Sequence, residues 1–533
     1  MRPISRRAAL MASALAMPAI ATLGSRSRAA DGVLRVMIDG NVSTVDPVVT
    51  TESMAIQHAF MVYDQLFATD KNTVPKPQMV GAYERAADGK SWRFALRDGQ
   101  RFHDGSPVES ADVIASLRRW AARKPSGQAL MREVDDIRAI DAKSFEIRLK
   151  RPFEVMLDVL ADPLNALCIM RRADAATDPA TPITTSVGSG PFIFVQEGWR
   201  PGDKAVYRRN PNYVARSEPP DGLAGAKLAK VERVEYSNIP DPTTSAQALV
   251  SGEVDMLTFP QLALLPVLRR AAGVEVRVLN GLGEQCILRV NHLVPPFNNP
   301  KARQALLYLV GGQTDYLAAI VRDRELQRPC WSVFGCGMPL ESNAGVGDWA
   351  QAANADRARQ LLQEAGYDGS PVVLINPPSN DRINAMSLVT AQKLRQAGVN
   401  VDLQAMDIGA WASRRNNRND PRTDRGGWNI FHTHGKMVSQ GSPLSNSAAV
   451  TTCDGSNWVG WPCDAPLQEM LEAFTTTPAE GRAALVARYQ ARFFEVLPYI
   501  PTGQFLLPVA FRNNLAGVLD GPGYPVMWNI EKR

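Results

Sequence analysis

The chain has 533 residues, of which 45% are hydrophobic and 21% are charged, with 59 Lys and Arg against 54 Asp and Glu. Five of the basic residues lie within the first 29 positions, which hold no acid, so the rest of the chain carries 54 basic and 54 acidic residues. This balance, without a basic cluster, excludes a typical nucleic-acid-binding protein. The length is too great for one hydrophobic core and predicts two or three domains.

The first 29 residues have the pattern of an export signal. The paired arginines Arg6 and Arg7 precede a short apolar run, and Ser27-Arg28-Ala29 places small residues at both positions that a signal peptidase reads. We therefore predict a twin-arginine-like signal peptide at residues 1–29 and a soluble, exported protein in the periplasm. No later segment reaches the roughly 18 apolar residues of a membrane helix.

A strand, two turns and a helix are predicted between residues 91 and 123. Residues 92–97 alternate apolar with polar side chains, and glycine turns follow at 98–99 and 104–105. Ser110 is placed to cap the following helix. His103 beside Asp104 is interpreted as part of the second turn, because neither neighbour supplies the nucleophile that a catalytic histidine would activate.

Helices alternate with strands along the rest of the chain. Between residues 355 and 410, two helical runs end at Gly366 and Gly398, and the apolar strands "PVVLIN" and "VNVDLQ" follow them. This repeated helix–strand order predicts a parallel sheet there. The whole chain is predicted to be α/β.

The six cysteines divide into two kinds. In an oxidising compartment, the short spacings predict the disulfides Cys330–Cys336 and Cys453–Cys463. Cys168 and Cys286 lie in apolar contexts and are predicted to be buried thiols. Zinc sites need C-x2-C pairs with further ligands, and the sequence contains none, so no metal or other cofactor is predicted.

Five segments carry a family resemblance. They are "VSTVDPVVTTESMAIQHAFMVYDQLF", "SWRFALRDGQRFHDGSPVESADVIASLRRW", "GSGPFIFVQEGWRPGDKAVYRRNPNYV", "NNPKARQALLYLV" and "ADRARQLLQEAGYDG". In sequence and order they resemble family 5 extracytoplasmic solute-binding proteins, the dipeptide, oligopeptide and nickel binding components of ABC importers. The second segment is the family's signature, and in the family it carries no chemistry.

The resemblance implies a two-lobed periplasmic binding protein fold (type II, cluster C-like) with the solute between two α/β lobes. Lobe I would comprise residues 30–75, 186–285 and 498–533, residues 76–185 would be a subdomain inserted into it, and lobe II would be 286–497. The implied function is capture of a di- or oligopeptide, or a peptide-like compound, by hinge closure. The expected partners are this solute and inner-membrane ABC permease subunits, and the protein is expected to be a monomer.

Other functions remain open. The same fold could bind a nickel or other metal chelate, an opine or glutathione. In peptide-binding members an aspartate after the Gly-Trp strand of lobe II pairs with the ammonium of the ligand, and this chain has no aspartate between Trp428 and Asp454. An exported hydrolase is the alternative from another class, but G-x-S-x-G, H-E-x-x-H and Walker motifs are missing from the sequence, so no enzymatic activity is expected.

Nine residues are candidates for contacts with the solute. His432 and His434 lie two apart on a predicted strand, so both imidazoles point to one face, where they could contact a polar ligand, bind a metal or have a structural role. Two histidines supply only half of a tetrahedral shell. The tryptophans could line the cleft or pack in the core; they are Trp411, Trp428 and Trp458. Positions from which family members contact ligand through lobe I are Thr44, Ser53, Thr502 and Gln504.

Overall fold

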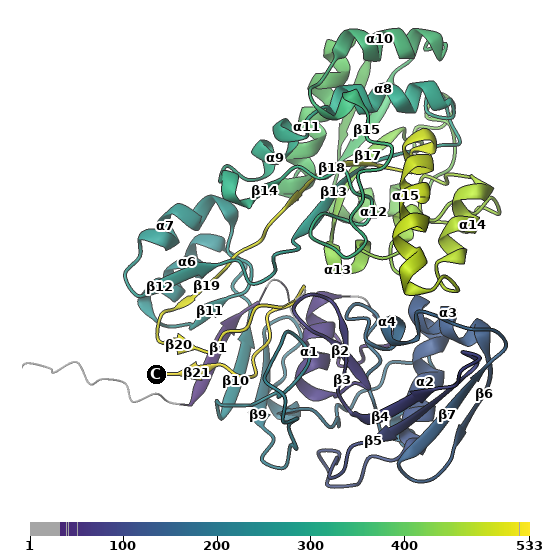
Figure 1. The fold of residues 1–533 in the computed structure, drawn as a ribbon. Coiled ribbons are helices and arrows are strands. Elements are labelled where there is room, and N and C mark those ends of the chain that lie inside the picture. Colours follow the sequence, from purple (N-terminus) through teal and green to yellow (C-terminus); the bar gives the residue numbers. More distant parts are fainter. Residues whose placement is uncertain (1–31, 39, 41, 51, 522) are drawn as a thin grey trace, which may run out of the picture.

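The structure is a computed structural model that describes residues 32–38, 40, 42–50, 52–521 and 523–533. The predicted signal peptide lies outside the described residues. Figure 1 shows two bodies of mixed helix and sheet, one above the other, joined at one side. Within the described part of the chain, every helix is too short or too polar to cross a membrane.

A seven-stranded sheet organises the first lobe. In spatial order its strands are β12 (Val274–Arg277), β19 (Val509–Arg512), β11 (Met256–Leu257), β1 (Val33–Met37), β10 (Arg233–Ser237), β9 (Lys204–Arg209) and β8 (Phe192–Phe194). β1 runs parallel to both of its neighbours, and the other pairs are antiparallel. The helices against these strands are α1 (Ser53–Val62), α6 (Pro242–Ser251) and α7 (Leu265–Arg270), with 3-10 turns η1 (Gln196–Gly198) and η2 (Leu262–Leu264). Short antiparallel pairs are β2 (Phe67–Thr69) with β3 (Pro75–Pro77), and β20 (Leu515–Ala516) with β21 (Glu531–Lys532).

A separate antiparallel sheet lies within residues 76–185. Its order is β4 (Val80–Arg85), β5 (Ser91–Leu96), β7 (Ser144–Leu149) and β6 (Val134–Ala139), and its helices are α2 (Ser110–Arg123), α3 (Pro125–Glu133), α4 (Met156–Leu160) and α5 (Arg172–Ala175). β5 confirms the predicted alternation, because its even-numbered residues 92, 94 and 96 are buried. The cap of α2 differs from the prediction: Glu109 and Asp112 form reciprocal bonds with the backbone, and Ser110 donates to the carbonyl of Asp141 instead.

The predicted turn at His103 is confirmed as a structural corner. The imidazole Nε2 lies 3.1 Å from the carbonyl oxygen of Gly190, and the backbone N–H of Gly188 donates to Nδ1 at 3.3 Å. Burial lowers the pKa of His103 to about 4, although the hydrogen bond to the Gly190 carbonyl acts to raise this pKa. A neutral ring therefore ties this turn to the segment at 188–190.

A six-stranded sheet organises the second lobe. Its order is β14 (Gln327–Arg328), β18 (Ile500–Phe505), β13 (Glu284–Val290), β17 (Ile430–Lys436), β15 (Val372–Asn376) and β16 (Val401–Ala405). β15 is parallel to β16 and β17, which confirms the predicted parallel pairing. The helices are α8 (Pro300–Val310), α9 (Thr314–Ile320), α10 (Ala355–Glu364), α11 (Asp381–Gln396), α12 (Ile408–Arg414), α13 (Met437–Gln440), α14 (Ala465–Ala473) and α15 (Ala479–Val496), with 3-10 turns η3 (Arg324–Leu326), η4 (Asp348–Ala350) and η5 (Ser447–Ala449).

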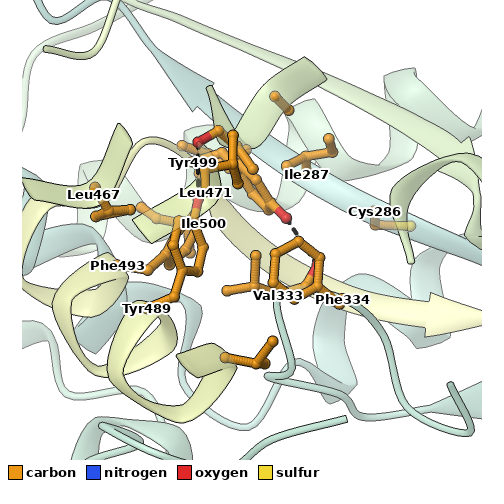
Figure 2. Packing of buried hydrophobic residues seen from close by; sticks show 14 of the residues in the cluster. Cys286, Ile287, Val333, Phe334, Leu467, Leu471, Tyr489, Phe493, Tyr499 and Ile500 are labelled. Atoms are coloured by element: carbon orange, nitrogen blue, oxygen red, sulfur yellow. Dashed lines mark hydrogen bonds between the residues drawn. The ribbon is translucent and has the colours of Figure 1, made fainter. Parts of the chain in front are cut away.

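Helix α15 closes the core of this lobe. Figure 2 shows Tyr489 and Phe493 of α15 beside Tyr499 and Ile500, next to Val333. The rings of Phe493 and Tyr499 meet edge to face at 4.8 Å, and the Tyr499 hydroxyl donates to the carbonyl of Val333 at 3.1 Å. The polar end of a fully buried tyrosine is thus satisfied within the core.

Both predicted disulfides are confirmed. Cys330 and Cys336 are joined with their Cα atoms 5.8 Å apart, and Cys453 and Cys463 with theirs 4.7 Å apart. Cys168 and Cys286 are free and buried, also as predicted.

The chain passes between the two large sheets twice, through residues 278–283 and 506–508. The expected start of the last lobe I segment at residue 498 differs from this, because β18 pairs with β13 and β14 in the six-stranded sheet. The chain therefore leaves that sheet after β18 rather than before it. The boundary at residue 498 was implied by the family resemblance, and the sequence of β18, IPTGQF, has no apolar alternation that would assign the strand to a sheet. The expected limits of the inserted subdomain stay predictions.

Candidate functional site

A pocket lies between the lobes, beside the two crossings. The cavity has a volume of about 30 Å³, and its lining comes from both lobes and both crossings. The lining includes Thr258, Phe259 and Tyr524 from the first lobe, Leu279 and Leu507 from the crossings, and Glu284 and Lys436 from the second lobe. We call it the hinge pocket. A molecule held here would touch parts that move relative to one another when the hinge opens.

Glu284 supplies a permanent negative charge to the hinge pocket. It is the first residue of β13, and its Oε2 lies 2.6 Å from Nδ1 of His434 and 3.9 Å from a guanidinium nitrogen of Arg382. Burial opposes its ionisation, but His434, Arg382 and Lys436 hold the pKa of Glu284 down, at about 2. The carboxylate is therefore ionised at every physiological pH.

Lys436 and Tyr524 join the two lobes across the pocket. The ammonium of Lys436, at the end of β17, lies 3.8 Å from the ring centroid of Tyr524 and 5.4 Å from that of Phe259. Both rings belong to the first lobe, so this cation–π contact is made only when the lobes are together. Burial raises the pKa of the Tyr524 phenol, and a hydrogen bond with Ser53 opposes the rise. The candidate Ser53, the first residue of α1, thus reaches this site through Tyr524.

The two candidate histidines have different surroundings. His434 reaches the hinge pocket through its bond with Glu284. His432 is fully buried, and its Nε2 lies 2.7 Å from the Thr390 hydroxyl of α11. Burial lowers the pKa of His432 to about 3, so its ring is neutral. Nowhere in the described part of the chain do three His, Cys, Asp or Glu side chains gather in a way that could hold a metal ion.

The candidate tryptophans surround Phe431 inside the second lobe. The ring centroids of Trp411, Trp428 and Trp458 lie 5.8, 5.1 and 5.7 Å from that of Phe431. Trp428 is fully buried and donates from Nε1 to the carbonyl of Arg415 at 3.1 Å, and the guanidinium of Arg415 stacks on Trp411 at 4.0 Å. The structure thus brings the three together as a packed cluster, and none of them lines the hinge pocket. A role in solute contact stays a prediction.

Gln504 fastens the hinge. From β18, its Nε2 donates to the carbonyl of Leu282 in the first crossing and to that of Cys336 at 3.1 Å, while its Oε1 accepts from the Cys336 N–H at 3.1 Å. One side chain therefore links β18 to the first crossing and to the disulfide loop.

Thr44 and Thr502 are apart from this pocket. Thr502 is fully buried, and its hydroxyl lies 3.7 Å from the sulfur of Met386. Thr44 is half-buried in the loop after β1, where its hydroxyl accepts from the Asp46 N–H at 3.2 Å. Their contact with a solute stays a prediction.

Arg482 joins the lobes at a second place. From α15, it donates to the carbonyl of Glu154 at 2.7 Å and to a carboxylate oxygen of Asp158 at 3.3 Å, both next to the inserted sheet. The Glu154 N–H donates back to the carbonyl of Thr475 at 2.8 Å. Burial raises the pKa of Asp158, and Arg482 opposes the rise. We call these contacts the Arg482 latch; Figure 1 shows the lower end of α15 above α4 and α3.

Sequence reasoning missed Glu284, Lys436 and Tyr524. Glu284 and Lys436 stand at paired positions at the ends of two adjacent strands. The acidic residue at the start of the fully buried strand β13 could have been the signal. Tyr524 lies in the segment "DGPGYPVM", whose glycines and prolines offered no periodicity to interpret.

Comparison with known proteins gives a consistent result. Residues 74–447 match the family described as bacterial extracellular solute-binding proteins, family 5. A probable peptide ABC transporter periplasmic-binding protein of Sinorhizobium fredii is 36% identical, over 95% of this chain and 94% of its own. The glutathione-binding protein GsiB of Salmonella typhimurium is 26% identical, over 90% and 91%.

Two solved structures share the fold. One is a dipeptide-binding protein of Pseudoalteromonas sp. SM9913 in complex with Met-Leu, with a TM-score of 0.75 and 19% identity, covering 94% of this chain and 100% of that one. The other is the binding protein AgaA of A. tumefaciens R10 in complex with agropinic acid, with a TM-score of 0.74 and 22% identity, covering 94% and 99%. They confirm the predicted two-lobed periplasmic binding protein fold. The chain therefore belongs to family 5 of the bacterial extracellular solute-binding proteins, a family of transporter components and not of enzymes.

Proposed function

We propose that this protein captures a peptide or peptide-like solute between its lobes and delivers it to the permease of an ABC importer. The observation that carries the proposal is the hinge pocket, whose lining comes from both lobes and both crossings. A solute that contacts both lobes favours the closed form by its differential affinity for the two states. The relative named as a probable peptide-binding component spans nearly the whole chain and supports peptides as the solute class.

The charges of the hinge pocket suit a zwitterion. Its charged lining residues within the described chain are Glu284 and Lys436, one of each sign. A peptide carries an ammonium and a carboxylate at its ends, so each end has a group of opposite sign to approach. Glu284 thereby takes the role for which the stretch from Trp428 to Asp454 offers no aspartate.

The setting follows from the same proposal. Residues 1–29 would direct export to the periplasm, where the mature chain would act as a monomer. The closed pair of lobes would then be the form that the inner-membrane permease subunits bind.

The test measures binding by the mature chain, residues 30–533. Thermal unfolding and calorimetry are followed with Met-Leu, tri- and tetrapeptides, glutathione, agropinate and nickel–histidine. Peptides should raise the melting temperature saturably, because they bind the native state preferentially. The proposal fails if every peptide leaves the melting temperature unchanged while glutathione, the opine or the nickel chelate raises it.

A charge-specific variant sharpens the test. Glu284→Gln should weaken Met-Leu at least tenfold, because a charge-assisted bond to the ammonium is lost, and should leave N-acetyl-Met-Leu within twofold. The matched control Glu480→Gln changes an exposed residue of α15 and should alter neither. An equal loss for both peptides would assign Glu284 a structural role instead.

A further inference from the structure

The first crossing between the lobes contains an asparagine followed by a glycine. Asn280 and Gly281 lie in the stretch 278–283 that joins β12 to β13, and the sequence contains an Asn-Gly pair only here. Asn280 lines the hinge pocket, whereas Gly281 is exposed. An asparagine can lose its amide by reaction with the next backbone nitrogen, and a following glycine hinders this reaction least because it has no Cβ.

The side chain of Asn280 is folded back over this peptide bond. Its Oδ1 accepts a hydrogen bond from the Leu282 N–H at 3.0 Å, which forms an Asx turn. The ring closed by this bond includes the backbone nitrogen of Gly281, the atom that would attack. The bond also withdraws electrons from the side-chain carbonyl, so Cγ of Asn280 becomes a better electrophile.

The backbone nitrogen of Gly281 is available for this attack. Within the described part of the chain, the Gly281 N–H donates no hydrogen bond. A Cβ at this position would have no atom within 4 Å, so the space around it is open. Hinge residues absorb the change in backbone torsions when lobes move. The pair can therefore reach the torsion at which the nitrogen meets Cγ.

We propose that Asn280 is a site of spontaneous deamidation and that the product weakens closure of the lobes. The Gly281 nitrogen forms a bond to Cγ, the bond from Cγ to Nδ2 breaks, and ammonia leaves with the proton of the Gly281 N–H. Water then opens the resulting succinimide. Opening at Cγ gives aspartate, and opening at the main-chain carbonyl gives isoaspartate. The net change consumes one water and releases one ammonia, without oxidation or reduction.

Either product carries a new carboxylate at position 280. The charged residues that line the hinge pocket within the described chain are Glu284 and Lys436. A second carboxylate would repel the carboxylate of a solute and would compete with it for Lys436. This effect rests on the proposed function, since it places the charged ends of the solute in the hinge pocket.

Isoaspartate changes the backbone of the crossing as well. The chain then runs through the former side chain, which inserts one methylene between Asn280 and Gly281. Arg328 donates to the Gly281 carbonyl at 2.9 Å, and Gln504 donates to the Leu282 carbonyl. A longer crossing cannot keep both carbonyls in place, so contacts that fasten the hinge would be lost.

The first experiment maps the modification by mass spectrometry. The mature chain is incubated at mildly alkaline pH, and the tryptic peptide 278–289, whose only asparagine is Asn280, is followed over time. It should gain the mass difference between OH and NH2 and separate into aspartate and isoaspartate forms. Gly281→Ala, whose Cβ meets open space, should slow the reaction at least about tenfold. Asn343, which is exposed and precedes Ala344, should stay intact as the internal control. An unmodified peptide 278–289, or an unchanged rate in Gly281→Ala, would overturn the site.

The second experiment is calorimetry with Met-Leu on fresh and incubated protein. Incubated wild type should lose binding in proportion to the modified fraction, and incubated Gly281→Ala should keep it. Asn280→Asp should weaken Met-Leu at least about fivefold, whereas Asn343→Asp, the same change at an exposed position, should stay within twofold. If position 280 is modified but Met-Leu binds unchanged, the effect on closure is overturned alone. If fresh wild type binds no dipeptide, the proposed function fails and the effect on closure falls with it, while the peptide map still decides the deamidation.

Discussion

The Arg482 latch provides a direct test of closure. Arg482→Met keeps most of the side-chain volume and removes the guanidinium that donates to Glu154 at 2.7 Å and to Asp158 at 3.3 Å. Both partners belong to the segment next to the inserted sheet, so both contacts are lost when the lobes separate. The open form should therefore be much less affected than the closed form.

The magnitude follows from the exposure of the partners. The partly buried hydrogen bond from the Arg482 guanidinium to the Glu154 carbonyl contributes about 1.5–3 kcal/mol. The ion pair adds little, below about 1 kcal/mol, because the Asp158 side chain is 40% exposed and screened by water. A loss of about 2 kcal/mol lowers the closed-to-open ratio about thirtyfold. Where the open form predominates without solute, apparent affinity falls by the same factor.

Calorimetry with two dipeptides of small side chains measures the effect, and solution scattering reports closure. The loss should be equal for both dipeptides, because the latch does not line the hinge pocket. Arg488→Met, at an exposed position of the same helix, is the matched control. A loss for only one dipeptide, or unchanged affinities with a native melting temperature, would refute the latch.

Three further predictions concern buried polar and charged side chains. Arg289→Lys should lower the free energy of unfolding by about 3 kcal/mol in urea, because the fully buried guanidinium donates to four carbonyls that one ammonium cannot all reach; a wild-type midpoint would contradict this. The pKa of Glu284, about 2, lies below its ordinary 4.5, so its ionised form stabilises the fold above pH 4.5, and this contribution, about 3 kcal/mol, disappears as pH falls toward 2. Unfolding of Glu284→Gln should lack that slope, and an unchanged slope would assign it to other carboxylates. His432→Phe should leave dipeptide affinity within twofold, because His432 is buried away from the pocket, and a loss above tenfold would restore it as a ligand contact.

Much of the fold could be predicted from local pattern. The helix–strand repeat at 355–410 could be predicted from apolar spacing and the glycines that end its helices. The two disulfides could be predicted because each joins cysteines that lie close together in the sequence. The lobe boundary at β18 could not be predicted, because its sequence, IPTGQF, has no apolar alternation and only its pairing with β13 shows which sheet it joins. The N-terminal cap of α2 also differed from the prediction. Glu109, paired with Asp112 in a capping box, takes the capping position that was assigned to Ser110.

The candidate site was less predictable, for a physical reason. Trp428 and His432 were chosen as candidates because a tryptophan can stack on a ligand and a histidine can bind or titrate. Both side chains are instead fully buried in the core. The hinge pocket is instead lined by Glu284, Lys436 and Tyr524, which lie far apart in the sequence. They come together only because the two lobes meet at this place. Of the predicted residues, Ser53 and His434 reach it, each through one neighbour.

The position of β19 determines the order in which the two lobes can complete their sheets during synthesis. This strand comes from the last part of the chain, yet it lies inside the first sheet, between β11 and β12. During synthesis the second lobe, whose strands lie between residues 284 and 505, can pair internally while the first sheet still lacks an interior member. A chain whose synthesis stopped before residue 509 would contain every strand of the six-stranded sheet but would lack β19 of the seven-stranded sheet. The first lobe can therefore complete its sheet only after the C-terminal segment has been made.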